Sequence, residues 1–387
     1  MIMNETDYEQ YLHRALDRLF QPVEELGFWH QEDNRIIFKH DMKGETLDQI
    51  IWTPDLKLEY RYGPYALMGV LYWRQRTHPE ETAYDDKIKA FLAFLKSKVS
   101  QEGAILGDDS GINHGLVLAS FCLGILNFPG IQTEYHETID KMYQYSLKRW
   151  PVEKIDSNQD YILLWGYTWL YELYQKIADK RAEDVLAYIR TFIKYMVSVQ
   201  APMGAFDSGD PRYIYHQRIF LPLWGFFKGL GFLKGNIPDE EWRSYHKAGK
   251  RGFSFATTRR MLSNGGFYWH EYLWLYKKPS SPLGRGVKFN PRKFLFYEVH
   301  QCLFAVAVAE YFRATEDSSF NIYLKRAVDW IFTTNPMGLD FVEKSKLDMP
   351  FRLLTKDGGV FFQDNLFKGT YETGIYIMAL TDLLEIV

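Results

Sequence analysis

Polar side chains of the kinds that bind and cleave sugars recur at six places in this sequence, each at the start of an apolar, helix-like segment. These places are Tyr60-Arg61-Tyr62, Asn113-His114, Asn158-Gln159-Asp160, Tyr215-His216-Gln217-Arg218, Glu298-Val299-His300-Gln301 and Gln363-Asp364-Asn365. Asn, Asp and Gln at a helix start usually satisfy backbone N–H groups as caps. His and Gln are poor caps, so their recurrence at equivalent places favours one shared site.

One chemistry that such groups could perform is hydrolysis of a glycosidic bond. That reaction normally uses two carboxyl groups about 5–10 Å apart, one as acid and one as base or nucleophile. We expect Asp160 and Asp364 to supply the carboxyl groups, with His216 and His300 as further catalytic side chains. The residues expected to bind the substrate are Arg61, Tyr62, Asn113, His114, Gln159, Tyr215, Gln217, Arg218, Tyr297, Gln301 and Trp269.

Other acidic residues near the same segments have a simpler explanation. Asp108 and Asp109 lie in GDDSG, and Asp207 and Asp210 lie in FDSGD. Asp and Gly are locally favoured in turns, and the turn interpretation is preferred for both stretches.

Two other kinds of function stay open. In a polysaccharide lyase or a uronate epimerase, a His or Tyr removes a proton from a uronic acid while Arg or Asn neutralises its carboxylate. Tyr215, His216 and Arg218 suit that chemistry. A non-catalytic saccharide- or lipid-binding protein is the other alternative. A prenyl-cyclase-like protein is disfavoured because the sequence contains no DxDD motif.

The elements that must position these residues are helices. Apolar periodicity predicts twelve, at 6–23, 61–78, 84–99, 113–128, 133–150, 158–177, 181–200, 215–234, 238–260, 297–315, 318–334 and 364–387. Pro and Gly stand at several of the breaks, as at Pro129-Gly130 and Pro151. The segment 27–41 alternates enough to predict a short hairpin.

The predicted helices fall into two alternating kinds. One kind is amphipathic, as in YDDKIKAFLAFLKSKV, and the other is apolar on nearly every face, as in HGLVLASFCLGIL. A helix that is apolar all round is buried all round. We therefore predict an all-α, (α/α)6 toroid of six helical hairpins, whose inner ring brings the six polar helix starts to one mouth. An open α-solenoid is the alternative.

We expect one toroid domain over 1–387. The stretch 262–296 has no helical period, and it is interpreted as a small irregular insertion over one mouth. Trp269 lies in this insertion.

Two motifs support a family resemblance. The stretch TTNPMGLDFV, 333–342, is similar to the NPxGxxFV segment of cellulase-type toroids, and His216-Gln217 resembles a His-Gln pair that opens an inner helix in unsaturated uronyl hydrolases. The pattern as a whole resembles the six-hairpin glycosidase-like superfamily. The resemblance implies an (α/α)6 toroid and a hydrolase that acts on oligosaccharides. Resemblance to the unsaturated uronyl hydrolases implies that these oligosaccharides contain uronic acid.

The amino-acid composition limits the kinds of ligand and partner that we expect the protein to bind. Aromatic residues make up 17% of the chain, an excess that suits either core packing or a sugar-binding groove. The net charge of −3 and the lack of a long Lys/Arg run argue against nucleic acid. The two cysteines, Cys122 and Cys302, lie in apolar segments, so we expect no disulfide, no metal and no cofactor. No signal peptide and no membrane-length apolar run is evident, which predicts a cytoplasmic protein without membrane contact.

Overall fold

The structure is a computed structural model of the 387-residue chain. It describes residues 4–44, 46–155, 161–201, 204, 206, 213–215, 217–261, 265–267, 270–272, 296–298, 301–332, 334–335, 338–350, 353–355 and 367–386.

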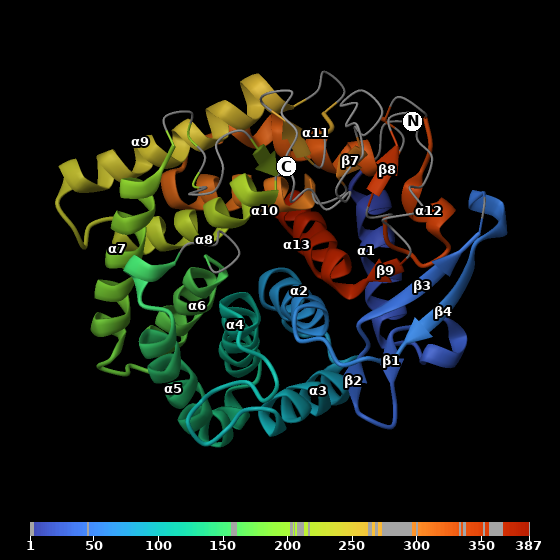
Figure 1. The fold of residues 1–387 in the computed structure, drawn as a ribbon, viewed down its shortest axis with the longest axis horizontal. Coiled ribbons are helices and arrows are strands. Elements are labelled where there is room, and N and C mark those ends of the chain that lie inside the picture. Colours follow the sequence, from blue (N-terminus) through green and yellow to red (C-terminus); the bar gives the residue numbers. More distant parts are fainter. Residues whose placement is uncertain are drawn as a thin grey trace, which may run out of the picture.

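Six apolar helices form a closed inner ring (Figure 1). They are α2 (Tyr62–Arg76), α4 (Gly111–Asn127), α6 (Ile162–Lys176), α8 (Gln217–Leu233), α10 (Gln301–Thr315) and α13 (Thr370–Ile386). Each contacts the next in this order, and α13 packs against α2 to close the ring. Every residue of α4 from Gly111 to Ile125 is buried, as expected of a helix that is apolar on all faces.

Six amphipathic helices surround this ring. They are α1 (Glu5–Phe20), α3 (Asp85–Ser97), α5 (Gln132–Arg149), α7 (Ala182–Val199), α9 (Asp239–Phe255) and α11 (Asn321–Phe332). In α7, for example, Val185, Ile189 and Phe192 are buried at helical spacing and the intervening side chains face outward. The closed ring confirms the predicted (α/α)6 toroid and excludes the open solenoid.

All twelve predicted helices are present, with shifted ends. The largest shift at a ring start is in α13, which begins at Thr370 rather than at 364, while α10 begins at Gln301 rather than at 297. The short helix α12 (Phe341–Ser345) was not predicted.

Short strands precede or flank several inner helices. The hairpin of β1 (Trp29–His30) and β2 (Arg35–Ile36) lies within the predicted 27–41 segment. A three-stranded antiparallel sheet, not predicted, has the order β4 (Ile51–Asp55), β3 (Lys39–Lys43), β9 (Phe367–Gly369). The remaining pairs are β5 (Tyr213–Tyr215) with β6 (His270–Tyr272), and β7 (Phe296–Glu298) with β8 (Leu353–Thr355).

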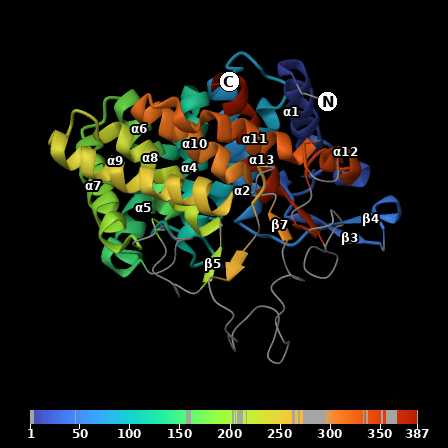
Figure 2. The ribbon, with the colours of Figure 1, turned by 90° about the horizontal axis from the view of Figure 1, so that it is seen from above.

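These strands gather at one face of the ring (Figure 2). The strand β6 lies within 262–296 and pairs with β5, which immediately precedes α8. Part of the predicted insertion is therefore a small sheet at this face. Most of 262–296 lies outside the described residues, and the division into one domain stays a prediction.

Glycines allow some inner helices to touch backbone to backbone. A Cβ atom added at Gly115 in α4 would lie 2.6 Å from the carbonyl oxygen of Ile162 in α6. One added at Gly69 in α2 would lie 2.5 Å from the carbonyl oxygen of Gly374 in α13. Real Cβ atoms do not approach a carbonyl oxygen so closely, so these positions require glycine.

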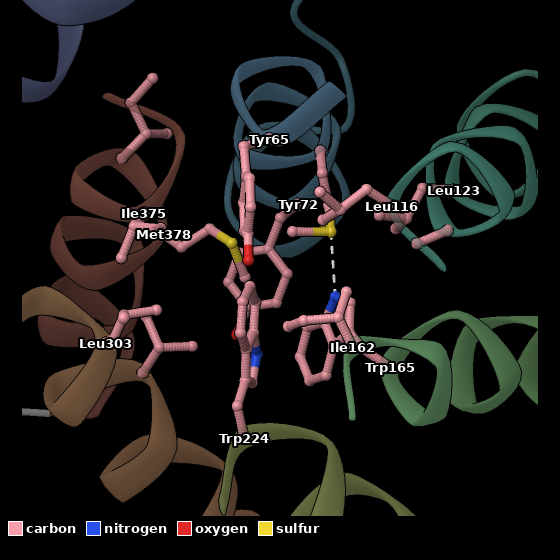
Figure 3. Close-up of a cluster of buried hydrophobic side chains, with 14 of the residues drawn as sticks. Tyr65, Tyr72, Leu116, Leu123, Ile162, Trp165, Trp224, Leu303, Ile375 and Met378 are labelled. Atoms are coloured by element: carbon pink, nitrogen blue, oxygen red, sulfur yellow. Dashed lines mark hydrogen bonds between the residues drawn. The ribbon is translucent and has the colours of Figure 1, made fainter. Parts of the chain in front are cut away.

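Side chains fill the axis of the ring (Figure 3). The rings of Trp165 and Trp224 lie 4.1 Å apart between their centroids, and Tyr65 stacks on Trp224 at 6.3 Å. The indole N–H of Trp165 donates to the sulfur of Met68 at 2.9 Å. These side chains therefore form a packed core between the inner helices.

No single helix in the described ranges is both long enough and apolar enough to cross a membrane, although the bent pair Gly111–Asn127 and Pro129–Arg149 satisfies both criteria together.

Candidate functional site at the helix-start mouth

The starts of the inner helices lie at one mouth of the toroid. Gly115, in the second turn of α4, packs against Ile162 at the start of α6, and Gly374, in the second turn of α13, packs against Tyr65 in the first turn of α2. Early residues of one helix thus meet early residues of the next, so these neighbours run in the same direction. Helix starts carry free N–H groups and the positive end of the helix dipole, which favour anionic or hydroxyl-rich ligands.

Arg61 is the most informative polar residue at this mouth. It is the N-cap of α2, and its backbone N–H donates to the Glu59 carboxylate at 3.2 Å. Its side-chain Nε and Nη2 atoms are buried, yet they have no hydrogen-bond partner within the described part of the chain. Buried N–H groups without partners cost free energy. The arrangement is therefore suited to an external acceptor such as a carboxylate or a sugar hydroxyl.

Aromatic rings pack against one another beside Arg61 in the sequence, at the start of α2. Tyr62 lies edge-on to Phe38 at 4.3 Å and to Tyr371 at 5.9 Å between ring centroids. Tyr371 in turn lies edge-on to Tyr65 at 4.4 Å. Burial raises the pKa of the Tyr65 phenol well above its ordinary value, against the opposing charge of Arg61. Flat rings beside a few polar groups are typical of sugar sites.

Asp108 and Asn113 form a polar pair at the start of α4. The amide of Asn113 donates to the Asp108 carboxylate at 2.7 Å, and that carboxylate also accepts the Ser110 backbone N–H at 2.9 Å. The second bond, from the Ser110 backbone N–H, belongs to the local turn that was predicted for GDDSG. The buried side-chain oxygen of Asn113 has no partner among the described residues. Asp109 instead pairs with Arg149 of the outer helix α5, away from the mouth.

His114 faces away from the mouth. Its Nε2 lies 2.8 Å from the Met142 carbonyl oxygen, and its ring stacks near Tyr145 and Trp150 of the outer layer. Burial lowers the pKa of this imidazole to about 4, so it is neutral at pH 7. The structure therefore gives His114 a packing role between α4 and α5, and does not bring it to the other polar residues.

Glu372 was not among the residues proposed from the sequence. It is 2% exposed in the first turn of α13, beside Gly369 and the Tyr62 ring. The predicted helix began at 364, which placed Asp364 at the helix start and left Glu372 in the helix interior. The available signal was a carboxylate in the otherwise uncharged run TYETGIYIMAL.

Several proposed site residues lie outside the described residues: Asp160, Gln159, His216, His300, Asp364 and Trp269. For others the structure gives the backbone alone. Gln217 is the first residue of α8, followed by Arg218, and Gln301 is the first residue of α10. Tyr215 and Tyr297 were expected at helix starts, but they lie in β5 and β7, just before α8 and α10.

The opposite mouth is closed by a buried ionic cluster. Arg313 donates to Tyr72, Glu310, Asp382 and Glu385, and Arg76 also pairs with Glu385. Burial raises the pKa of Asp382 to about 6, whereas Arg313 holds the pKa of Glu310 below its usual value against the opposing effect of burial. Both Nη atoms of Arg313 donate within this cluster, whereas its Nε and one oxygen of Asp382 are buried without a partner among the described residues.

A cavity of about 620 Å³ lies near this cluster, at the ends of α2, α4 and α6. Its wall includes Glu172, which accepts from Lys228 at 2.7 Å and from Gln75 at 3.1 Å. Lys228 itself lies 3.6 Å from the centre of the Trp169 ring. Glu172 on this wall is thus engaged with Lys228 and Gln75, and Arg74 pairs with Asp85.

The part of the chain that the structure describes holds no group of three His, Cys, Asp or Glu side chains arranged to bind a metal. Cys122 and Cys302 are buried free thiols, and burial raises the pKa of both.

Comparison with known proteins identifies the fold. No family model and no curated protein matches the sequence. Among solved structures, a D-mannose isomerase superposes with a TM-score of 0.66 at 13% identity, over 99% of this chain and 98% of the isomerase. Cellobiose 2-epimerase from Bacillus thermoamylovorans gives 0.63 at 11% identity, over 99% of this chain and all of the epimerase.

A variant of unsaturated glucuronyl hydrolase from Streptococcus agalactiae gives a TM-score of 0.54 at 11% identity, over 99% of this chain and 93% of the hydrolase. These neighbours are six-hairpin glycosidase-like toroids, which confirms the resemblance at the level of fold. At sequence identities this low, the similarity shows the fold and does not show an activity.

Proposed function

We propose that this protein is a carbohydrate-active enzyme that hydrolyses glycosidic bonds in an oligosaccharide bound at the helix-start mouth. The fold supports this class, since solved toroids with the same architecture include a glucuronyl hydrolase and two enzymes that rearrange sugars. The side chains at the helix-start mouth support this location for the site. Buried polar atoms of Arg61 and Asn113 have no partner among the described residues, and aromatic rings lie at the same mouth.

The observation that carries the proposal is Arg61. Its two buried nitrogen atoms have no partner in the described ranges, although the guanidinium lies near the Tyr65 phenol. An oligosaccharide offers the missing acceptors as hydroxyl groups or, in an acidic sugar, as a carboxylate. Asn113 offers a free acceptor oxygen on the neighbouring helix.

Hydrolysis requires a carboxyl group on each side of the scissile bond. Asp160 and Asp364 remain our sequence-based proposals for that pair, with His216 and His300 beside them. Asp160 lies just before α6 in the sequence, and α6 starts at the same mouth as α4. The substrate-contacting residues proposed from the described part are Arg61, Tyr62 and Asn113.

Proton abstraction is the second candidate, as in a lyase or a sugar epimerase. Arg61 favours it because a guanidinium with unpaired N–H groups is suited to neutralising a uronate carboxylate while a base removes the neighbouring proton. Two of the reported neighbours, an epimerase and an isomerase, rearrange sugars. A protein that only binds saccharides would use the same mouth without turnover.

One assay separates these functions. The protein is incubated with panels of neutral and uronic-acid oligosaccharides while reducing ends and absorbance near 235 nm are followed. We expect new reducing ends without new absorbance. New absorbance would indicate elimination, and a changed sugar without cleavage would indicate epimerisation. Binding without any change would leave a saccharide-binding protein.

A further inference from the structure

The cavity of about 620 Å³ lies at the far mouth of the toroid, opposite the helix-start mouth, where α2, α4 and α6 end. Its volume is in the range of small-molecule sites, roughly 300–1,000 Å³. The charges and the free hydrogen-bonding groups on its wall indicate which kind of molecule it could hold.

The fixed charges around this cavity nearly cancel. Arg74 pairs with Asp85 at 3.3 Å, and Glu172 pairs with Lys228 at 2.7 Å. Lys176 adds one positive charge in the last turn of α6. The C-terminal ends of the three helices offset that charge, since each carries about half a negative charge. With a net charge close to zero, the cavity is better suited to a neutral ligand than to an anion or a cation.

Three polar side chains of α6 line the cavity: Glu172, Gln175 and Lys176. Their spacing of three and four residues places them on one face of the helix. The side chain of Glu172 is 31% exposed, so its carboxylate remains accessible beside Lys228. Gln175 and Lys176 are exposed, and neither side chain has a hydrogen bond or an ion pair within the described part of the chain. This face of α6 therefore offers both donors and acceptors.

Gln75 of α2 supplies a further acceptor on the wall. Its amide nitrogen donates to the Glu172 carboxylate at 3.1 Å. The amide cannot be reversed without turning its oxygen toward that carboxylate, which accepts hydrogen bonds only. Its Oε1 atom is buried and has no partner among the described residues. Because an unmet acceptor costs free energy, a ligand that donates a hydrogen bond is favoured here.

Hydroxyl groups suit this wall because each can donate and accept a hydrogen bond. Pro79 and Leu126 add an apolar surface for the C–H groups of a sugar ring. We propose that the far-mouth cavity is a second ligand site, which binds a neutral mono- or disaccharide through its hydroxyl groups. Binding at this site is independent of the hydrolysis proposed for the helix-start mouth.

Titration of the protein with glucose, mannose, maltose and cellobiose tests this site. The side-chain amide of Gln175 is followed by NMR in protein labelled with ¹⁵N-glutamine, and its signal is assigned from its absence in Gln175→Ala. We expect at least one of these sugars to shift the signal saturably.

Matched variants locate the binding. Lys176→Ala should weaken it about tenfold, the effect of losing a hydrogen bond to a charged group, and Leu126→Trp should abolish it by filling the cavity. Lys148→Ala is the control, since it removes the same charge from an exposed position of α5 outside the cavity. Lys148→Ala and Arg61→Met should both leave the titration unchanged. Thermal unfolding checks that each variant is folded.

Each outcome bears on the site. No shift of the Gln175 signal with any of the four sugars overturns it, and so does equal weakening by Lys176→Ala and Lys148→Ala. A larger shift with glucuronate or spermidine than with the neutral sugars overturns the assignment of a neutral ligand. A saturable shift in a protein that cleaves no saccharide supports the second site and contradicts the proposed hydrolysis alone.

Discussion

At the scale of single residues, the decisive observation is which buried polar atoms have partners. Arg313 and Arg61 are both arginines at an end of the inner ring. The Nη atoms of Arg313 donate to Tyr72 and to three carboxylates, whereas Nε and Nη2 of Arg61 are buried without partners in the described part of the chain. Nε of Arg313 is also buried without a partner there, so the two arginines differ at their Nη atoms, which Arg313 uses within the cluster.

Substitution of Arg61 by Met tests this difference. Met keeps much of the volume and removes the unpaired polar atoms, so the apparent free energy of unfolding should be unchanged or higher. The KM for an acidic oligosaccharide should rise about 10- to 100-fold, the value of one charge-assisted hydrogen-bonded contact. Thermal unfolding and steady-state kinetics on the same preparation provide both values. A loss of stability with an unchanged KM would show that Arg61 is structural.

At the scale of the elements, close contacts between inner helices set where the site residues lie. The pair α4 and α6 depends on Gly115, whose position leaves no room for a side chain beside the Ile162 carbonyl. This contact aligns the starts of the two helices, and with them Asn113 and the segment that precedes α6. Packing within the ring thus controls the geometry of the mouth.

Gly115→Ala should destabilise the protein, and Gly130→Ala is its matched control. At Gly115 the added methyl group meets backbone and forces the helices apart, which costs about 1–3 kcal/mol or more. At Gly130 nothing lies within 4 Å of an added Cβ, so a change within about 0.5 kcal/mol is expected. Denaturant unfolding compares them. Equal midpoints for both variants would contradict the contact.

At the scale of the whole molecule, the two mouths carry different kinds of side chain. The helix-start mouth carries aromatic rings beside Arg61 and Asn113, and the far mouth carries a cluster of arginines and carboxylates. Asp382 and Glu310 share Arg313, and only one of the two carboxylates is held below its ordinary pKa. The far cluster therefore links the ends of α2, α10 and α13, and we propose the helix-start mouth for binding.

The shared arginine predicts a pH dependence of stability. Burial raises the pKa of Asp382 to about 6, from 3.8 in the unfolded chain, so the folded state binds a proton that the unfolded state releases. Its contribution to stability is fully present below about pH 4 and is lost as the pH rises through about 6. Asp382→Asn should flatten this part of the curve of unfolding free energy against pH. An unchanged curve in the variant would assign the dependence to other groups.

The sequence predicted the helices better than the site. Apolar periodicity located all twelve long helices because burial on one face or on all faces has a clear pattern in the chain. The starts were less certain, since short strands such as β7 and β9 pair with segments distant in sequence, Leu353–Thr355 and Lys39–Asp41. A shift of six residues at α13 was enough to select Asp364 and miss Glu372.

The directions in which side chains point also could not be predicted from the sequence. Asn113 and His114 are adjacent, yet a rotation of about 100° per helical residue turns one toward Asp108 and the other toward Met142 in the outer layer. In the same way, Asp108 accepts the Ser110 backbone N–H just before α4, while Asp109 pairs with Arg149. Residue type and spacing indicated polar residues at one mouth. Only the packing against the outer helices shows which of these residues, such as His114 and Asp109, contact the outer layer instead.

The central claim is that the helix-start mouth hydrolyses an oligosaccharide, and proton NMR of the anomeric region tests it most directly. The protein is incubated with uronic-acid and neutral oligosaccharides, with Arg61→Met as a parallel sample. The account predicts new reducing-end anomeric signals with the wild type, slower in the variant, and no vinyl proton of an unsaturated sugar. Spectra that stay unchanged with every saccharide, from a folded wild type, would contradict it.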